Sequence, residues 1–137
     1  MLFKPLGGDR SAAPAGTRGH VGWHELYAAD WSSGFDFYAR QFGWTQADAI
    51  DMDPLGTYQL FATGGAPMGG MMNKPDSIPS PAWVYHFNVA EANAVAARVT
   101  EHGGRILNGP HQVPGGSWIL HCLDPQGALF ALVAPNR

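Results

Sequence analysis

The chain has 137 residues, of which 45% are hydrophobic and 14% are charged, so it is long enough for one globular domain and too apolar to be disordered. The net charge is −3 and there is no basic run, which argues against nucleic acid or an anionic membrane as a partner. No apolar stretch approaches the roughly 18 residues of a membrane span, and no secretory signal is evident. The single cysteine, Cys122, excludes an internal disulfide. We therefore expect a cytoplasmic protein.

A strand, a helix and three short strands are predicted for the first half of the chain. Residues 1–19 precede them and indicate a flexible N-terminal arm, because they are rich in Gly, Pro and Ala and have no periodicity. The helix is indicated by Phe35, Tyr38 and Phe42, which recur at helical spacing. The expected elements are a strand at 21–28, a helix at 32–42, and strands at 44–50, 57–62 and 68–72.

The same order of elements repeats after a Pro-rich linker at 73–81. The expected elements are a strand at 83–89, a helix at 91–102, and strands at 105–107, 117–123 and 128–133. The halves align at an offset near 60, and the aligned pairs are Trp23 with Val84, Phe61 with His121, and Met71 with Ala131. The sequence therefore predicts an α+β fold in which two βαβββ modules, at 20–72 and 82–137, form one domain.

This duplicated order resembles the vicinal oxygen chelate superfamily, which includes glyoxalase I, bleomycin-resistance proteins, fosfomycin-resistance enzymes and extradiol dioxygenases. Local motifs strengthen the resemblance over residues 20–135. They are WHEL at 23–26, FY followed by FGW at 37–44, MGGMM at 68–72, ILNGP at 106–110 and DPQGALFAL at 124–132. The resemblance implies two half-barrels around a cleft, and apolar sheet faces that a homodimer would cover.

Metal-dependent members of the family hold a divalent cation with His or Gln from the first strand and Glu from the last strand of each half. The resemblance places these four positions on Trp23, Met71, Val84 and Ala131. Trp, Val and Ala offer no lone pair, and a Met thioether is too soft for the usual cations. The resemblance therefore implies the fold without the usual metal site, and we expect no metal cofactor at these positions.

Strand alternation predicts which side chains face the cleft. In the strand at 83–89, alternate residues from Trp83 to Val89 form an apolar face, which leaves the opposite face for the cleft. The same reasoning in the strands at 21–28 and 117–123 identifies three candidate catalytic residues and a set of ligand-binding wall residues. The candidate catalytic residues are Glu25, His86 and His121, and the walls are Trp23, Tyr27, Phe61, Met71, Val84 and Ile119.

Each of the three polar residues has more than one interpretation. A buried carboxylate at Glu25 needs a partner, which a ligand, a proton-transfer role, or a salt bridge to Arg105 or a second subunit would supply. His86 and His121 suit a general base or a ligand contact, or a histidine bonded to a backbone carbonyl. Together the three residues also match a displaced two-His, one-carboxylate site for Fe, Zn, Ni or Mn.

Three functions are compatible with these residues. The main hypothesis is a metal-free member of the family that binds a small, mostly apolar or aromatic organic molecule in the cleft. The alternative is a lyase, isomerase or dioxygenase that uses Glu25, His86 and His121 as acid–base groups or as the displaced metal site. A third hypothesis is an assembly module with a vestigial cleft. A homodimer is expected under each of them.

Overall fold

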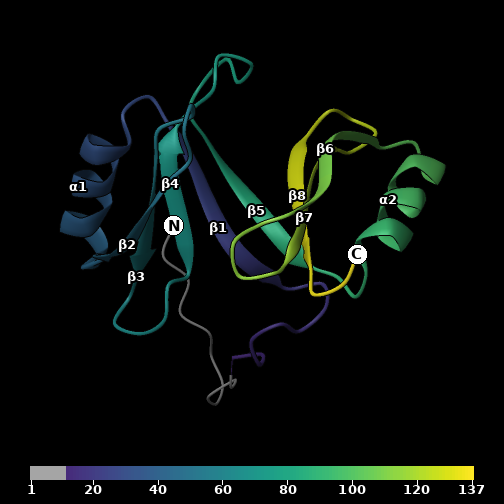
Figure 1. Cartoon of the computed structure of the whole chain (residues 1–137), viewed down its shortest axis with the longest axis horizontal. Coiled ribbons are helices and arrows are strands. Elements are labelled where there is room, and N and C mark those ends of the chain that lie inside the picture. Colours follow the sequence, from purple (N-terminus) through teal and green to yellow (C-terminus); the bar gives the residue numbers. More distant parts are fainter. Residues whose placement is uncertain (1–11) are drawn as a thin grey trace, which may run out of the picture.

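Two βαβββ modules form the part of the chain that this computed structural model describes, residues 12–137 (Figure 1). The arm predicted at 1–19 falls mostly outside these residues. The first module contains β1 (Val21–Ala28), α1 (Trp31–Phe42), β2 (Thr45–Asp51), β3 (Thr57–Ala62) and β4 (Gly69–Asn73). The second contains β5 (Ala82–Asn88), α2 (Ala92–Glu101), β6 (Arg105–Gln112), β7 (Trp118–Leu123) and β8 (Leu129–Ala134). The predicted α+β fold with a duplicated module is confirmed.

All eight strands form one sheet in the order β2-β3-β4-β1-β5-β8-β7-β6. Within each module the first strand pairs in parallel with the last, and the two modules join through the antiparallel pair of β1 and β5. Figure 1 shows α1 and α2 on the outer sides of the modules, with β1 and β5 between them. The order of strands in one module is thus repeated, reversed, in the other, and both modules turn their inner strand faces toward the middle of the molecule.

A constant spacing of 61 residues relates equivalent positions of the two modules. In each module a row of three paired residues crosses the third, fourth and first strands at positions that face inward. These two equivalent rows are Leu60, Gly70 and Glu25 in the first module, and His121, Ala131 and His86 in the second. Glu25 and His86 therefore occupy the same position in the two modules, and His121 occupies the position of Leu60.

Phe61 and Met71 lie on the opposite face from the one predicted. Both are fully buried and belong to the core between α1 and the sheet, not to the inner face. The alignment of the two halves placed them opposite His121 and Ala131. In the structure the equivalents of these two residues are Leu60 and Gly70, so the alignment was shifted by one residue. A shift of one residue turns a strand side chain to the other face of the sheet. The prediction that Phe61 and Met71 line the cleft is therefore wrong.

Each helix covers the outer face of its own module and completes a separate core. Asp30 accepts a hydrogen bond from the backbone of Ser33 at the start of α1, and Gly43 ends that helix with a positive φ of 67°. The core beneath α1 includes Phe61, and the core beneath α2 includes Leu120. Neither helix is long and apolar enough to cross a membrane.

We expect Phe61→Ala to lower the free energy of unfolding by about 3–5 kcal/mol. The substitution removes a fully buried ring that stacks on Trp44, with the two ring centroids 4.5 Å apart. Phe37→Ala is the matched control, since that ring is 59% exposed and its loss should change stability by about 0.5 kcal/mol or less. Urea unfolding measures both. Equal effects would contradict the assignment of Phe61 to the core.

Candidate functional site

A cavity of about 560 Å³ lies between the two modules and is lined by residues from both of them. Both modules of one chain therefore contribute to this cavity. Its walls are mostly apolar or aromatic, and include Trp23, Tyr27, Met52, Leu60, Met72 and Ile119. Asn88, Asn108, His111 and Ser117 add polar groups elsewhere in the lining.

The structure places the predicted wall residues in two groups. Trp23, Tyr27 and Ile119 line the cavity. Phe61, Met71 and Val84 do not. Val84 is on the same strand face as His86, but it pairs with Glu25 across β1 and β5 and is completely buried. The prediction that Val84 forms part of the wall is therefore wrong, because neighbouring groups cover it.

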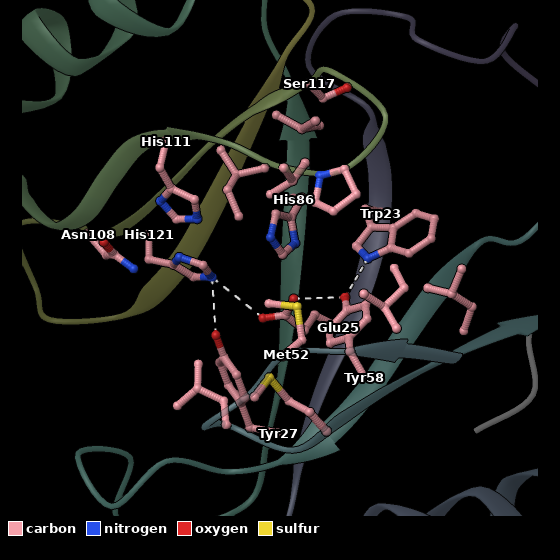
Figure 2. Close-up of a pocket in the computed structure, with 18 of the residues that line it drawn as sticks. Trp23, Glu25, Tyr27, Met52, Tyr58, His86, Asn108, His111, Ser117 and His121 are labelled. Carbon is pink, nitrogen blue, oxygen red and sulfur yellow. Dashed lines mark hydrogen bonds and ion pairs between the residues drawn. The ribbon is translucent and has the colours of Figure 1, made fainter. Parts of the chain in front are cut away.

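Glu25, His86 and His121 converge at one point of the cavity (Figure 2). One ligand atom from each residue lies within 4.8 Å of the other two. Nε2 of His121 is 3.5 Å from Oε1 of Glu25, and the two imidazole rings meet edge to face with their centroids 5.5 Å apart. The three side chains come from β1, β5 and β7, so the fold gathers residues that are far apart in the sequence.

A chain of hydrogen bonds holds the carboxylate of Glu25 in place. The hydroxyl of Tyr58 donates to Oε2 of Glu25 at 2.9 Å, and Nε1 of Trp23 donates to the oxygen of Tyr58 at 2.8 Å (Figure 2). The hydroxyl of Tyr27 lies 3.3 Å from Nε2 of His121. The second oxygen of the carboxylate, Oε1, thereby remains directed toward the histidines.

Tyr58 is the main site residue that the sequence reasoning missed. It lies on β3 two residues before Leu60, on the inner face, whereas the one-residue slip had assigned the other face to the cleft. A constant 61-residue spacing applied to β3 would have identified it. The same correction moves the family's metal position on β4 from Met71 to Gly70, and neither residue is a ligand for the cations of this family.

Gly70 makes room for the ring of Tyr58. A Cβ atom placed on Gly70 would overlap three atoms at the phenol end of that ring. The ring therefore lies directly over the backbone of β4, where any larger residue would displace it. In this way the absence of a side chain on β4 allows Tyr58 to reach Glu25.

Two buried polar atoms of the cluster have no hydrogen-bond partner: Oε1 of Glu25 and Nδ1 of His86. An unpartnered buried polar atom costs about 1–3 kcal/mol, and more when the group is charged. Both atoms belong to residues that line the cavity. The arrangement therefore leaves hydrogen-bonding or metal-ligating capacity available to a guest molecule or ion.

Burial and charge set the protonation states of the cluster. Burial alone would raise the pKa of Glu25, but its contact with His121 and the electrostatic influence of both histidines outweigh this and lower the pKa to about 2. Burial lowers the pKa of His86 to about 4. Burial and the nearby carboxylate raise the pKa of Tyr27 and of Tyr58. At neutral pH the cluster therefore contains an ionised Glu25 and a neutral His86.

Comparison with known proteins places these features in a family. The model of the Glyoxalase/Bleomycin resistance protein/Dioxygenase superfamily matches residues 18–132. The protein CFP32 of Mycobacterium tuberculosis, whose name assigns it provisionally to the glyoxylases, is 28% identical over 113 residues, covering 82% of this chain and 43% of that protein. The anthracycline biosynthesis protein DnrV of Streptomyces peucetius is 28% identical over 128 residues, covering 83% of this chain and 46% of that protein. The chain thus spans less than half the length of these curated relatives.

Solved structures with the same fold include methylmalonyl-CoA epimerases. The enzyme from Mycobacterium tuberculosis has a TM-score of 0.63 and 20% identity, over 87% of this chain and 91% of that one. A variant of the Streptomyces coelicolor enzyme in complex with 2-nitronate-propionyl-CoA has a TM-score of 0.65 and 17% identity, over 86% of this chain and 98% of that one. At this level of identity the likeness shows the fold alone.

We expect Gly70→Ala to lower the free energy of unfolding by about 1–3 kcal/mol, because the new methyl group forces the Tyr58 ring away from Glu25 and Trp23. Gly65→Ala is the matched control: its Cβ meets nothing within 4 Å, and the change should stay within about 0.5 kcal/mol. Urea unfolding measures the stability of each variant. The NMR resonance of the Trp23 indole NH reports whether its hydrogen bond to Tyr58 is kept. An unshifted resonance in Gly70→Ala would argue against the contact.

We expect stability to fall as pH drops from 6.5 to 4 in protein dialysed against a chelator. The pKa of His86 is about 4 in the folded state and about 6.5 when unfolded, so only the unfolded chain gains its proton in this interval. Protonation then favours unfolding by about 3 kcal/mol in total. His86→Gln should flatten this part of the stability profile, measured by urea unfolding at each pH. An unchanged profile would show that His86 titrates normally.

Proposed function

Because the chain belongs to the glyoxalase/bleomycin resistance protein/dioxygenase superfamily, as its motifs predicted, we propose that its cavity binds a small organic molecule that is mostly apolar or aromatic. The composition of the cavity carries this proposal. Its volume of about 560 Å³ and its mostly apolar lining surface, with three polar side chains gathered at one point, are typical of small-molecule sites.

The charge of the lining favours an uncharged or cationic guest. None of the lining residues in the described part of the chain is Lys or Arg, and Glu25 contributes a buried negative charge. An anionic guest would enter an apolar cavity beside this carboxylate without a cation to balance it. The acyl-CoA ligand bound by the Streptomyces coelicolor epimerase carries several phosphate charges, so this cavity suits a different class of molecule.

The proposed binding does not depend on the family's four metal positions. In the observed register these are Trp23, Gly70, Val84 and Ala131, and none of them offers an oxygen or nitrogen side-chain donor to a cation of the usual kind. Apolar walls alone provide affinity through burial of the guest's surface. We therefore expect binding in protein from which metal has been removed.

Proton-transfer catalysis is the second candidate function. It is supported by the convergence of Glu25, His86 and His121 on the cavity, and it would suit a lyase or isomerase reaction. A general base works best when its pKa is near the working pH, however, and the pKa values of Glu25, about 2, and His86, about 4, are well below neutrality. These values favour binding over proton abstraction.

The homodimer stays a prediction. Both modules of a single chain contribute residues to the lining of the cavity. Exposed aromatic side chains on α1, namely Phe37 and Phe42, remain available for an interface.

The proposal is tested by calorimetric titration of chelator-treated protein with 2-naphthol and with 2-naphthoate, which share one ring system and differ in charge. We expect 2-naphthol to bind with a dissociation constant below a millimolar and 2-naphthoate to bind about tenfold more weakly or worse. Glu25→Gln should narrow this difference, because it removes the negative charge beside the guest. Failure of both compounds and of a wider set of neutral aromatics would refute the proposal.

Two variants on β7 show whether binding occurs in the cavity. Ile119 lines the cavity and Trp118, its neighbour in the sequence, packs against the core on the other face. Ile119→Trp should fill the cavity and weaken 2-naphthol binding by about tenfold or more, whereas Trp118→Phe should leave it within about twofold. Equal effects would place the bound compound elsewhere.

A further inference from the structure

Glu25, His86 and His121 form a buried cluster in which two donor atoms have capacity that is not used within the described part of the chain. The three residues are only 6%, 1% and 9% exposed. Oε1 of Glu25 and Nδ1 of His86 have no hydrogen-bond partner. Figure 2 shows all three side chains directed toward one another at the cavity. A buried carboxylate and a buried imidazole without partners are unfavourable unless something else satisfies them.

We propose that these three side chains bind one divalent first-row transition-metal ion, with the remaining coordination positions open to the cavity. Two imidazoles and one carboxylate are a donor set that suits Zn²⁺ and Fe²⁺. Bonds of about 2.0–2.2 Å place ligand atoms about 3–3.5 Å apart. The observed separations are at most 4.8 Å, so modest side-chain rotations bring the three donors into bonding range.

This site differs from the one that the family resemblance implies. Glu25 and His86 are each two residues along their strands from Trp23 and Val84, the positions of the resemblance, and these two donors are equivalent in the two modules. His121 comes from β7, a strand that provides none of the four family positions. The proposed ion is therefore held by a different set of side chains on the same framework.

Neighbouring side chains support the proposed ligands. Tyr58 donates its hydroxyl to Oε2 of Glu25, which fixes the carboxylate with Oε1 on the side of the histidines. Trp23 in turn donates to Tyr58. Hydrogen bonds of this kind orient metal ligands and raise metal affinity. A single ion would also give the apolar cavity one strong point of attachment for an oxygen atom of its guest.

The inference goes beyond the proposed binding of an organic molecule and does not rest on it. It depends on the donor atoms alone, so the metal itself is the probe. The organic guest is measured separately, with 2-naphthol and chelator-treated protein. Metal binding can fail while 2-naphthol still binds, and the reverse is also true. The failure of one proposal is therefore distinguishable from the failure of the other.

The experiment is a titration of chelator-treated protein with Co²⁺, followed by the visible d–d absorption of the ion and by elemental analysis after removal of free metal. We expect one ion per chain, with a dissociation constant in the micromolar range or lower, and displacement by Zn²⁺. Glu25→Gln, His86→Gln and His121→Gln should each weaken binding at least about 100-fold, which exceeds the 10–100-fold typical of residues that only support ligands. Tyr58→Phe should fall within that smaller range.

His111→Gln is the matched control. His111 lines the same cavity but is not a member of the cluster, so its replacement should leave Co²⁺ binding within about twofold. If a cluster variant does not fold, the imidazole NMR resonances of the wild-type protein decide the question: Zn²⁺ should shift those of His86 and His121 and leave that of His111. Absence of one-to-one binding, or equal losses in His111→Gln and Glu25→Gln, would overturn the proposal.

Discussion

The buried carboxylate of Glu25 is the constraint on which the rest of the site depends. A charge in an apolar cavity must be stabilised by its surroundings, and here the stabilisation comes from the Tyr58 hydroxyl on one oxygen and from His121 beside the other. This requirement accounts for features that otherwise seem unrelated. The indole of Trp23 orients Tyr58, and the missing side chain at Gly70 gives the Tyr58 ring its place.

Duplication explains how such a cluster is assembled from separate strands. The two modules place equivalent side chains on equivalent rows, so Glu25 and His86 come close together as diagonal neighbours on β1 and β5 without any special loop. The equivalence also shows where the modules have diverged. His121 stands where the first module has Leu60, and this difference supplies the third polar member of the cluster.

Alternation and motif spacing were enough to predict both modules and the inward direction of Glu25, His86 and His121. The wall residues were less predictable, because a face assignment fails completely when the register is wrong by one residue. Phe61 and Met71 were placed on the inner face for this reason, and Tyr58 was overlooked. Val84 shows a different limit of sequence reasoning. Its face was predicted, but burial depends on neighbours from other strands, which alternation within one strand does not describe.

The apolar walls and the polar cluster have different consequences for selectivity. Apolar walls such as those formed by Met72 and Ile119 favour binding of any guest of suitable size. The dispersion and dehydration contributions to the binding free energy depend little on the position of a single atom. The cluster acts through complementarity. Oε1 of Glu25 is buried without a hydrogen-bond partner, so a guest or ion that satisfies this atom gains strongly and one that does not leaves it unpaired. A site that must satisfy buried polar groups discriminates more sharply than an apolar pocket does. Under the proposed function, Glu25 and the two histidines select the chemical identity of the guest, while the walls select its size.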